Sequence, residues 1–466
     1  MNIFSNIKKQ YSATGGYLEF LKIAFPLVVS TGVDAIQLFI NRIFLSRYSQ
    51  DAFAAASPAG MAQWAIMSFF IGALAYIDIF VAQYYGKKEY RSIGPAIWQS
   101  LYLSFISAII ILFLSFFSKR FFVNLGHPYT VALEEVEFFK ILCYGAFPTI
   151  AVAALSGFYT GQGKTKVVLF IWIYGVIVNI ILDYCMIFGN FGFPEMGIRG
   201  AALANNIASI TMFVIYMFMI SSKKNSIVYN TRKFMPDFDF IKTFLGYTIP
   251  NGTQFFFDMA SFSIFVLIIG RIGIEELTAS NIVTNINSLV IAPLIGCSLT
   301  TSIMVGNYLG KNKASIAQVS VRSASHILYT YALFVILVLI FLPNQLIYPF
   351  SGGVQTVIIE RTRPMAVNIL RILAVYLIFD IVNMIFSSAI KGAGDTVFVM
   401  KILASFSIFL IIIPVYFIVI VFKLSIYVAW WSMLIYVISL AFIFYLRYRS
   451  NKWKKLRVID MDIVDG

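Results

Sequence analysis

The sequence predicts an all-α integral membrane protein, with twelve transmembrane helices in two six-helix bundles related by a parallel pseudo-two-fold repeat. Three observations predict this fold class. Of the 466 residues, 60% are hydrophobic and only 12% are charged, whereas soluble domains carry roughly 25% charged residues. The apolar residues form runs that are long enough to cross a bilayer. The second half of the chain also repeats motifs of the first half.

Each transmembrane helix is predicted from a run of about 20 apolar residues, which spans roughly 30 Å of hydrocarbon. The first six runs lie near 18–45, 53–84, 95–117, 132–160, 166–189 and 198–221, and the second six near 241–270, 278–308, 320–342, 364–390, 397–420 and 424–446. We therefore expect an N-lobe over 1–222, a cytoplasmic linker over 223–240, a C-lobe over 241–447 and a basic cytoplasmic tail over 448–466.

Lysine and arginine gather in alternate connectors, and this pattern predicts the orientation of the chain. The connectors after spans two, four, six, eight and ten contain "GKKEYR", "GKTK", "SSKKNS…TRKF", "GKNKAS" and "KGAGD", and the flanking segments contain Lys8, Lys9 and "RYRSNKWKKLR". By the positive-inside rule these segments are cytoplasmic. We expect a multi-pass protein of the cytoplasmic (plasma) membrane with both termini cytoplasmic. Its net charge of +14 then reflects topology, and no nucleic-acid partner is expected.

The internal repeat becomes visible when "FLKIAFP" (20–26) is placed beneath "FLGYTIP" (244–250), an offset of 224 residues. At this offset "AQYYGKK" (82–88) lies beneath "GNYLGKN" (306–312), and further on "TGQGKT" (160–165) lies beneath "KGAGDT" (391–396). Six spans per half is an even number, so both halves enter the membrane in the same direction. This is the parallel-repeat arrangement of transporters that rock two bundles around a central site.

Carboxylates occur inside the apolar runs, where each costs about 2.5–3.5 kcal/mol on insertion scales. They are Asp34, Asp78, Asp183, Asp258 and Asp380. Such acids either pair with a neighbouring helix or face water, ions or substrate. The repeat makes Asp34 and Asp258 equivalent, each eight residues after a proline. Those prolines, Pro26 and Pro250, are expected to kink their helices and free backbone carbonyls for a cation.

Two spans carry polar stripes. In the tenth span Tyr376 and Asp380 stand at i and i+4, hence on one helical face, with Asn383 one turn further. In the fifth span Asn179 and Asp183 have the same i, i+4 spacing. A phenol, a carboxylate and an amide on one stripe form a candidate set of oxygen ligands for Na⁺ or a proton relay, although tyrosine at this spacing also occurs as a packing residue.

Several further motifs stand beside the proline-led first and seventh spans, namely "DAFAAAS", "EELTAS", "AQYYGKK", "GFYTGQGKT", "NIILDYCMIFGNFGFPEMGIRGAALA" and "IKGAGDT". Through these motifs the whole chain resembles the multidrug and toxic compound extrusion (MATE) family, whose superfamily also holds lipid and oligosaccharide flippases. The long segment through the fifth and sixth spans is the most specific of these stretches.

The resemblance implies a cation site in each half. In the NorM-like branch, the second-half site uses an acid on the seventh span and a Tyr-x3-Asp pair on the tenth. These positions match Asp258, Tyr376 and Asp380, with Asp in place of the usual Glu on the seventh span.

The first-half site of the family combines an Asp near the end of the first span with Asn and Asp on the fifth. The last two match Asn179 and Asp183, but the first-span acid falls on Asn41. A proton switch of the usual form would then need Asp34, about two turns earlier. We expect these four residues to form an N-lobe proton or substrate site, with coupling through the second half.

The expected function is that of a cation-coupled antiporter, Na⁺ favoured over H⁺, which exports organic, cationic or amphipathic compounds by alternating access. The alternative is a lipid-linked oligosaccharide flippase of the same superfamily. Such a flippase would need several cationic side chains in its cavity, and the candidates in this sequence are Arg42 and Arg371. An ion channel would need a filter motif or a ring of charges, and none is evident.

The sequence contains few of the residues that catalytic or metal sites commonly use. There are two histidines, His127 and His326, and three scattered cysteines without metal-ligand spacing. We expect no enzyme activity, no cofactor and no metal beyond the coupling ion. The expected partners are a small organic substrate and the lipid bilayer, and the chain is expected to act as a monomer. The sequence leaves the identity of the substrate open.

Overall fold

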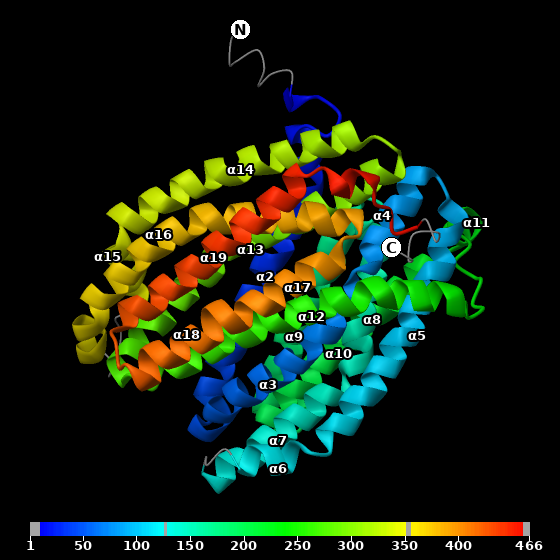
Figure 1. The fold of residues 1–466 in the computed structure, drawn as a ribbon. Coiled ribbons are helices and arrows are strands. Elements are labelled where there is room, and N and C mark those ends of the chain that lie inside the picture. The colour runs from blue at the N-terminus through cyan, green and yellow to red at the C-terminus, as the bar shows by residue number, and fades with distance from the viewer. Residues whose placement is uncertain (1–9, 125–127, 351–355, 460–466) are drawn as a thin grey trace. The chain divides into compact units, whose positions relative to one another are not determined.

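The computed structural model describes residues 10–124, 128–350 and 356–459, and within these residues it is helical without a strand (Figure 1). Lys8, Lys9, His127 and residues 460–466 of the expected tail lie outside the described residues.

The predicted spans form helices at the predicted places. In the first half these are α2 (Tyr17–Tyr48), α3 (Gln50–Ala75) continued by α4 (Ile77–Lys87), α5 (Tyr90–Ser115), α7 (Tyr129–Tyr144) followed by α8 (Ala146–Thr160), α9 (Thr165–Phe188) and α10 (Ile198–Ile220). In the second half they are α12 (Phe238–Ile269), α13 (Ile274–Gly310), α14 (Ala314–Phe341), α16 (Thr356–Ala393), α17 (Thr396–Phe406) with its continuation to Val421, and α19 (Ile426–Arg449). The connectors contain α6 (Ser118–Val123), α11 (Lys223–Tyr229) and α15 (Pro343–Ile347).

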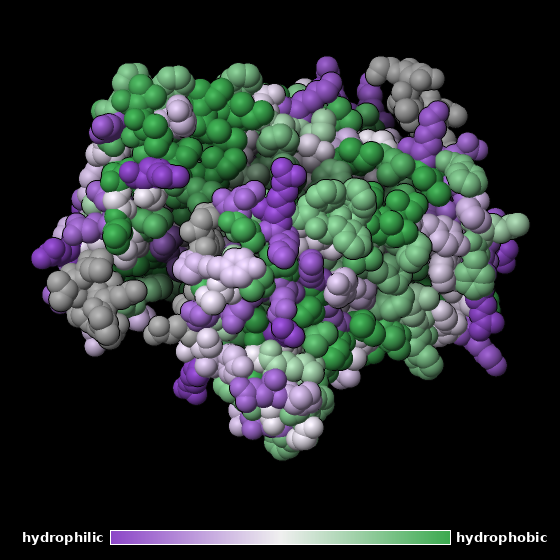
Figure 2. Space-filling view, turned by 90° about the horizontal axis from the view of Figure 1, so that it is seen from below, coloured by the Kyte–Doolittle hydropathy of each residue, from purple (hydrophilic) through white to green (hydrophobic). Residues whose placement is uncertain are grey.

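The number of spans agrees with the sequence. Eleven helices of the described chain are long and apolar enough to cross a membrane, and α7 and α8, bent by 46° at their junction, make a twelfth if they form one span. Large apolar side chains such as Phe25, Phe113 and Leu267 are exposed along these helices, and hydrophobic residues cover large areas of the face in Figure 2. Such a surface suits helices that face lipid.

The eleventh span departs from regular α-helix. After α17, π-helical turns at Ser407–Ile412 (η4) and Phe417–Val421 (η5) flank the short α18 (Ile413–Tyr416). Pro414 lies in α18 and has no backbone N–H to give to Leu410, four residues earlier. Ser432 of α19 compensates, because its Oγ donates to the Leu410 carbonyl at 3.0 Å.

By its internal contacts the chain divides into two units. Unit 1 comprises Met1–Val28 and Phe257–Arg457, and unit 2 comprises Val29–Phe256 and Val458–Gly466. In unit 1, α16 packs against α13, α14 and α19; in unit 2, α10 packs against α7, α8 and α9 (Figure 1). The boundaries between the units fall inside α2 and α12, both of which remain helical through Pro26 and Pro250. The predicted kinks at these prolines stay predictions.

The units do not coincide with the expected lobe limits, because the first part of each proline helix packs with the other half of the sequence. In unit 1, Gly296 of α13 lies so close to α2 that a Cβ on it would be 2.7 Å from the Val28 nitrogen. In unit 2, a Cβ on Gly72 of α3 would be 2.6 Å from Cγ of Phe255 in α12. Gly72 and Gly296 are equivalent in the repeat, so both units use the same packing. The expected lobe limits stay a prediction.

A second pair of equivalent glycines makes another matched contact. A Cβ on Gly161 would come closer than 3.0 Å to the Asp78 carbonyl, and one on Gly392 equally close to the Ser302 carbonyl. Asp78 and Ser302 are themselves equivalent at the 224-residue offset. The glycines of the "TGQGKT" and "KGAGDT" motifs therefore allow close backbone approach, which is a structural role.

The residues that follow these glycines also act structurally. Lys164 donates to Gln162 Oε1 at 2.7 Å, and burial, with Lys224 nearby, lowers the pKa of the Lys164 ammonium. The equivalent Asp395 forms an ion pair with Arg447 of α19 at 2.7 Å. The equivalent connectors of the two halves are thus stabilised by different interactions, a hydrogen bond in the first half and an ion pair in the second.

Candidate functional site

Unit 1 brings together the three residues predicted for a second-half cation site. Asp258 lies on α12, and Tyr376 and Asp380 lie on one face of α16. Both carboxylates lie within electrostatic range of the Tyr376 phenol. Asp380 is only 4% exposed, whereas Asp258 and Tyr376 are half-buried. Two carboxylates from two helices are therefore within electrostatic range of one phenol inside unit 1.

The Asp380 carboxylate is oriented by its own helix. Asn383, one turn further along α16, donates from Nδ2 to Asp380 Oδ1 at 3.1 Å. This bond occupies one lone pair and leaves capacity on both carboxylate oxygens, since an ionised carboxylate offers about four acceptor positions. The predicted stripe of Tyr376, Asp380 and Asn383 is thus present as a connected polar set.

Tyr436 of α19 belongs to the same cluster, although the sequence reasoning missed it. Its phenol is 6% exposed and lies within electrostatic range of both Asp258 and Asp380. Its hydroxyl and Ser407 Oγ are 3.3 Å apart. Tyr436 sits in a uniformly apolar run without a local signal, so only the packing of α19 on α16 reveals its place.

The cluster offers several oxygen donors to a ligand. Its carboxylates and phenols are hard oxygen donors, the type that hard cations prefer. Two acids that lie near the same phenols in membrane-spanning helices are costly unless a cation or a proton neutralises part of their charge. Within the described residues, no group of three or more His, Cys, Asp or Glu side chains is placed to hold a metal ion.

Unit 2 brings together most of the first-half candidates. Asn179 and Asp183 of α9 are fully buried. The side-chain amides of Gln37 in α2 and Asn179 are 2.9 Å apart, and in the orientation that satisfies its neighbours Asn179 donates from its amide nitrogen to Asp183 Oδ2 at 3.1 Å. The amide of Asn41 lies against Asp183, and its nitrogen donates to Asp183 Oδ2 in the orientation that satisfies both groups. The other oxygen, Asp183 Oδ1, is buried and has no hydrogen-bond partner among the described residues.

Gln37 is a second residue that the sequence reasoning missed, but here a signal existed. Gln37 precedes Asn41 by four residues, so both amides lie on one face of α2. The two amides therefore face α9 from α2, where the family pattern would have an aspartate.

Asp34 is not part of this contact set. Its Oδ1 accepts a hydrogen bond from Trp172 Nε1 of α9, and its side chain is exposed. Asp34 precedes Asn41 by two turns of α2, about 10 Å along the helix. The structure therefore gives Asp34 a different partner from Asp183.

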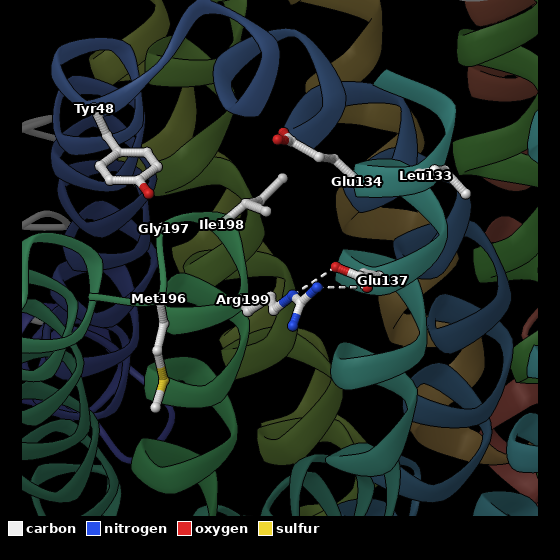
Figure 3. A pocket seen from close by; sticks show the side chains of 8 residues that line it. All are labelled: Tyr48, Leu133, Glu134, Glu137, Met196, Gly197, Ile198 and Arg199. Atoms are coloured by element: carbon white, nitrogen blue, oxygen red, sulfur yellow. Dashed lines mark hydrogen bonds and ion pairs between the residues drawn. The ribbon is translucent and has the colours of Figure 1, made fainter. Parts of the chain in front are cut away.

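A surface hollow of about 280 Å³ in unit 2 contains none of the predicted site residues. It is lined by Tyr48, Leu133, Glu134, Glu137, Met196, Gly197, Ile198 and Arg199 (Figure 3). Arg199 of α10 spans it to Glu137 of α7 with two bonds, of 2.5 Å from Nε and 2.7 Å from Nη2. Because both side chains are largely exposed, 59% and 43%, this pair contributes little stability.

Comparison with known proteins gives a consistent assignment. The family model MatE matches residues 26–185 and 250–418. A probable multidrug resistance protein NorM of Thermotoga maritima is 25% identical over 453 residues, covering 96% of this chain and 95% of its own length. Another protein of that name, from Listeria monocytogenes, is 27% identical over 305 residues, covering 64% of this chain and 66% of its own length.

Solved structures share the fold. A MOP superfamily transporter from Pyrococcus furiosus superposes with a TM-score of 0.85 at 18% identity, covering 96% of this chain and 98% of its own. An outward-facing multidrug resistance MATE family transporter gives 0.85 at 19% identity with the same coverage.

Proposed function

The chain belongs to the MatE family and is a multi-span membrane transporter, and from this premise we propose that it is a cation-coupled antiporter that exports organic, cationic or amphipathic compounds. The observation that carries the proposal is the set of Asp258, Tyr376 and Asp380 in unit 1. The names of its NorM relatives support multidrug efflux as the transport activity.

The cluster in unit 1 favours Na⁺ over H⁺ as the coupling ion. A proton needs only one basic oxygen, whereas Na⁺ needs several oxygen donors around it. The carboxylates of Asp258 and Asp380 come with the phenols of Tyr376 and Tyr436, which supplies such a set. Cation binding would also offset the cost of two acids in the membrane.

In unit 2 the arrangement suits a proton or substrate site, and coupling through it is the less favoured route. Asp183 is a single buried carboxylate that faces amides in place of a second acid. The exposed Asp34 provides a further acid on the same helix as Asn41.

The ion gradient is sufficient for active export by alternating access. One charge that crosses 100 mV contributes about 2.3 kcal/mol, and a tenfold concentration ratio of substrate corresponds to about 1.4 kcal/mol. One or two inward cations per cycle therefore drive export against a tenfold or greater gradient. Cation binding at Asp258 and Asp380 would disfavour substrate in the outward-facing state, and substrate binding from the cytoplasm would restart the cycle.

The orientation belongs to the proposal as well. The basic connectors support an orientation with both termini in the cytoplasm and the protein in the cytoplasmic membrane. A single chain holds both candidate sites, so the monomer is the proposed transport unit. The proposed lobes are 1–222 and 241–447, joined by the linker over 223–240.

Ethidium efflux from proteoliposomes tests the proposal, with a Na⁺ gradient and a pH gradient imposed separately on wild type and on Asp258→Asn. We expect efflux driven by Na⁺ that is lost in the variant. Efflux driven only by the pH gradient would indicate that Asp183 and Asp34 form the coupling site. Absence of efflux under both gradients would favour the lipid-linked oligosaccharide flippase instead.

A further inference from the structure

The segment between α10 and α12, residues 223–238, carries exposed apolar and basic side chains together, and we call it the linker segment. It belongs to unit 2, and its first part, α11, packs against α5 (Figure 1). Ile227, Met235 and Phe238 are 76%, 73% and 77% exposed. The basic side chains of the segment are exposed as well: Lys223, Lys224, Arg232 and Lys233. An apolar surface that is rimmed by polar residues in this way indicates an interaction site.

The part of the linker segment that follows α11 is not helical, and α5 satisfies its backbone. Three side chains of α5 donate to backbone carbonyls of the segment: Trp98 to Thr231 at 2.8 Å, Gln99 to Met235 at 3.0 Å and Tyr102 to Phe234. Gln99, which is fully buried, also accepts from the Asp237 nitrogen at 3.1 Å. Irregular backbone is tolerated at membrane depth only where protein groups satisfy it. These bonds therefore allow the linker segment to lie against the bilayer.

The donors on α5 also set the depth of the linker segment. The apolar run that predicts this span begins near residue 95, so Trp98 and Tyr102 lie one to two turns inside it, about 5–10 Å along the helix. Tryptophan and tyrosine are the residues enriched where a membrane meets water. Backbone that is bonded to these two side chains therefore lies near the level of the lipid headgroups.

Positive charge gathers around α11 at this level. The linker segment carries four basic residues and one acid, Asp237. The Asp237 carboxylate is engaged at the start of α12, where its Oδ1 accepts from the Phe240 nitrogen at 3.0 Å, and Asp239 follows as an exposed acid of that helix. Lys224 lies within electrostatic range of Lys164, an exposed residue of the connector before α9. Neighbouring ammonium groups repel each other, so this surface favours an anionic partner.

We propose that the linker segment is a docking surface for anionic phospholipids of the cytoplasmic leaflet. Its basic side chains bind the headgroup phosphates, and Ile227, Met235 and Phe238 enter the acyl boundary beneath them. Basic and apolar side chains on one segment at the membrane surface are typical of interfacial anchors. The choice of leaflet rests on the orientation in the proposed function, whereas the docking depends on neither the transported compound nor the coupling ion.

Native mass spectrometry of the protein in detergent tests the headgroup preference, with phosphatidylglycerol and phosphatidylcholine titrated separately. Lys223→Gln combined with Lys224→Gln removes two ammonium groups from the linker segment. The matched control is Lys452→Gln combined with Lys455→Gln, an exposed basic pair in the 3₁₀ turn η6 (Lys452–Lys455). Trp453 of that turn is buried, so the control pair has charge without an exposed aromatic side chain between its members.

We expect wild type to bind phosphatidylglycerol in preference to phosphatidylcholine. The linker pair should weaken binding of phosphatidylglycerol on the order of tenfold, up to about fivefold for each lysine near an anionic surface. Lys223→Arg combined with Lys224→Arg keeps the charge and should bind as wild type does. An equal loss in the control pair would reveal a general effect of charge and overturn the proposal. Displacement of the lipid by an equal concentration of inorganic phosphate would reveal a free-phosphate site and overturn it too.

The depth of the linker segment is measured in vesicles of phosphatidylcholine and phosphatidylglycerol, by electron paramagnetic resonance of a spin label on Met235→Cys. The native cysteines are buried, so the label goes to the introduced thiol. The control label is on Lys166→Cys, at an exposed position in the first turn of α9.

The Met235→Cys label should be relaxed more by oxygen, which concentrates in the bilayer, than by a water-soluble nickel chelate, and the Lys166→Cys label should show the reverse. Nickel access at Met235→Cys equal to that at Lys166→Cys would place the linker segment in water and contradict the docking surface. Neither lipid binding nor label depth involves export, so both results stand apart from the ethidium test of the proposed function.

Discussion

Asn383 and Asp380 are joined on α16 by a hydrogen bond of 3.1 Å, in which the Asn383 amide holds one oxygen of a carboxylate that is 4% exposed. The bond orients the Asp380 carboxylate without neutralising it. In the proposed site, this charge would be available to a cation that also contacts Asp258 and Tyr376.

Asp380→Asn should abolish coupling and preserve the fold. The new amide oxygen still accepts from Asn383, so packing is retained while one of the two charges of the cluster is lost. Removal of a partner from a charge-assisted contact costs about 1.5–3 kcal/mol, which corresponds to at least a tenfold loss of Na⁺ affinity. Binding of ²²Na⁺ and Na⁺-driven efflux measure this loss. Asn383→Ala keeps the charge and should weaken binding less. Wild-type efflux in Asp380→Asn would refute the coupling role.

Tyr436→Phe should raise the Na⁺ concentration needed for half-maximal efflux, because it removes a phenol oxygen within range of Asp258 and Asp380. The ring, and with it the packing of α19, is kept. We expect a several-fold increase, in line with about 1 kcal/mol for one neutral hydrogen-bonding group. The matched control is Tyr445→Phe at an exposed position of the same helix. An identical Na⁺ dependence for Tyr436→Phe and wild type would remove Tyr436 from the site.

Much of this site was predictable because its signals are local or repeated. The i, i+4 spacing of Tyr376 and Asp380 puts both on one face of a helix, and the repeat singles out Asp258. The spans themselves follow from hydrophobic length. Tyr436 could not be found in this way, since its contact with the acids depends on how α19 packs on α16.

The unit boundaries were unpredictable for the same kind of reason. Hydropathy gives one uninterrupted run for α2 and another for α12, and nothing in either run indicates that its two parts pack with different helices. Beside the π-helical turns around Pro414, the Leu410 carbonyl likewise accepts a hydrogen bond from Ser432 of a neighbouring helix. The local hydrophobic pattern determines which residues form helices. Contacts between segments distant in the sequence determine to which unit each part of a helix belongs.

Gly161→Ala and Gly392→Ala should each destabilise the protein by about 1–3 kcal/mol, the usual cost of overpacking. In both cases the added methyl group would meet a facing backbone carbonyl, which cannot rotate away. Thermal unfolding in detergent measures the effect. Gly246→Ala is the control, because nothing lies within 4 Å of its Cβ position and alanine favours a helix by about 0.5–1 kcal/mol. Equal melting temperatures for all three variants would contradict the matched packing.

Asn41→Asp should make transport responsive to a pH gradient. The Asn41 amide now lies against Asp183, which is fully buried. A carboxylate in its place would put two acids side by side, and like charges at that separation in a membrane span cannot both stay ionised at low cost. The pair would therefore hold one proton at neutral pH and release it when the surroundings open to water.

The measurement is efflux under a pH gradient alone, compared for wild type, Asn41→Asp and Asn41→Ala. The alanine variant removes the amide without adding an acid, so it separates a gain of proton coupling from loss of the contact with Asp183. We expect pH-driven efflux to rise in Asn41→Asp only, with Na⁺-driven efflux retained through Asp258 and Asp380. If Asn41→Asp responds to pH no more than Asn41→Ala does, the unit 2 cluster has no part in proton coupling.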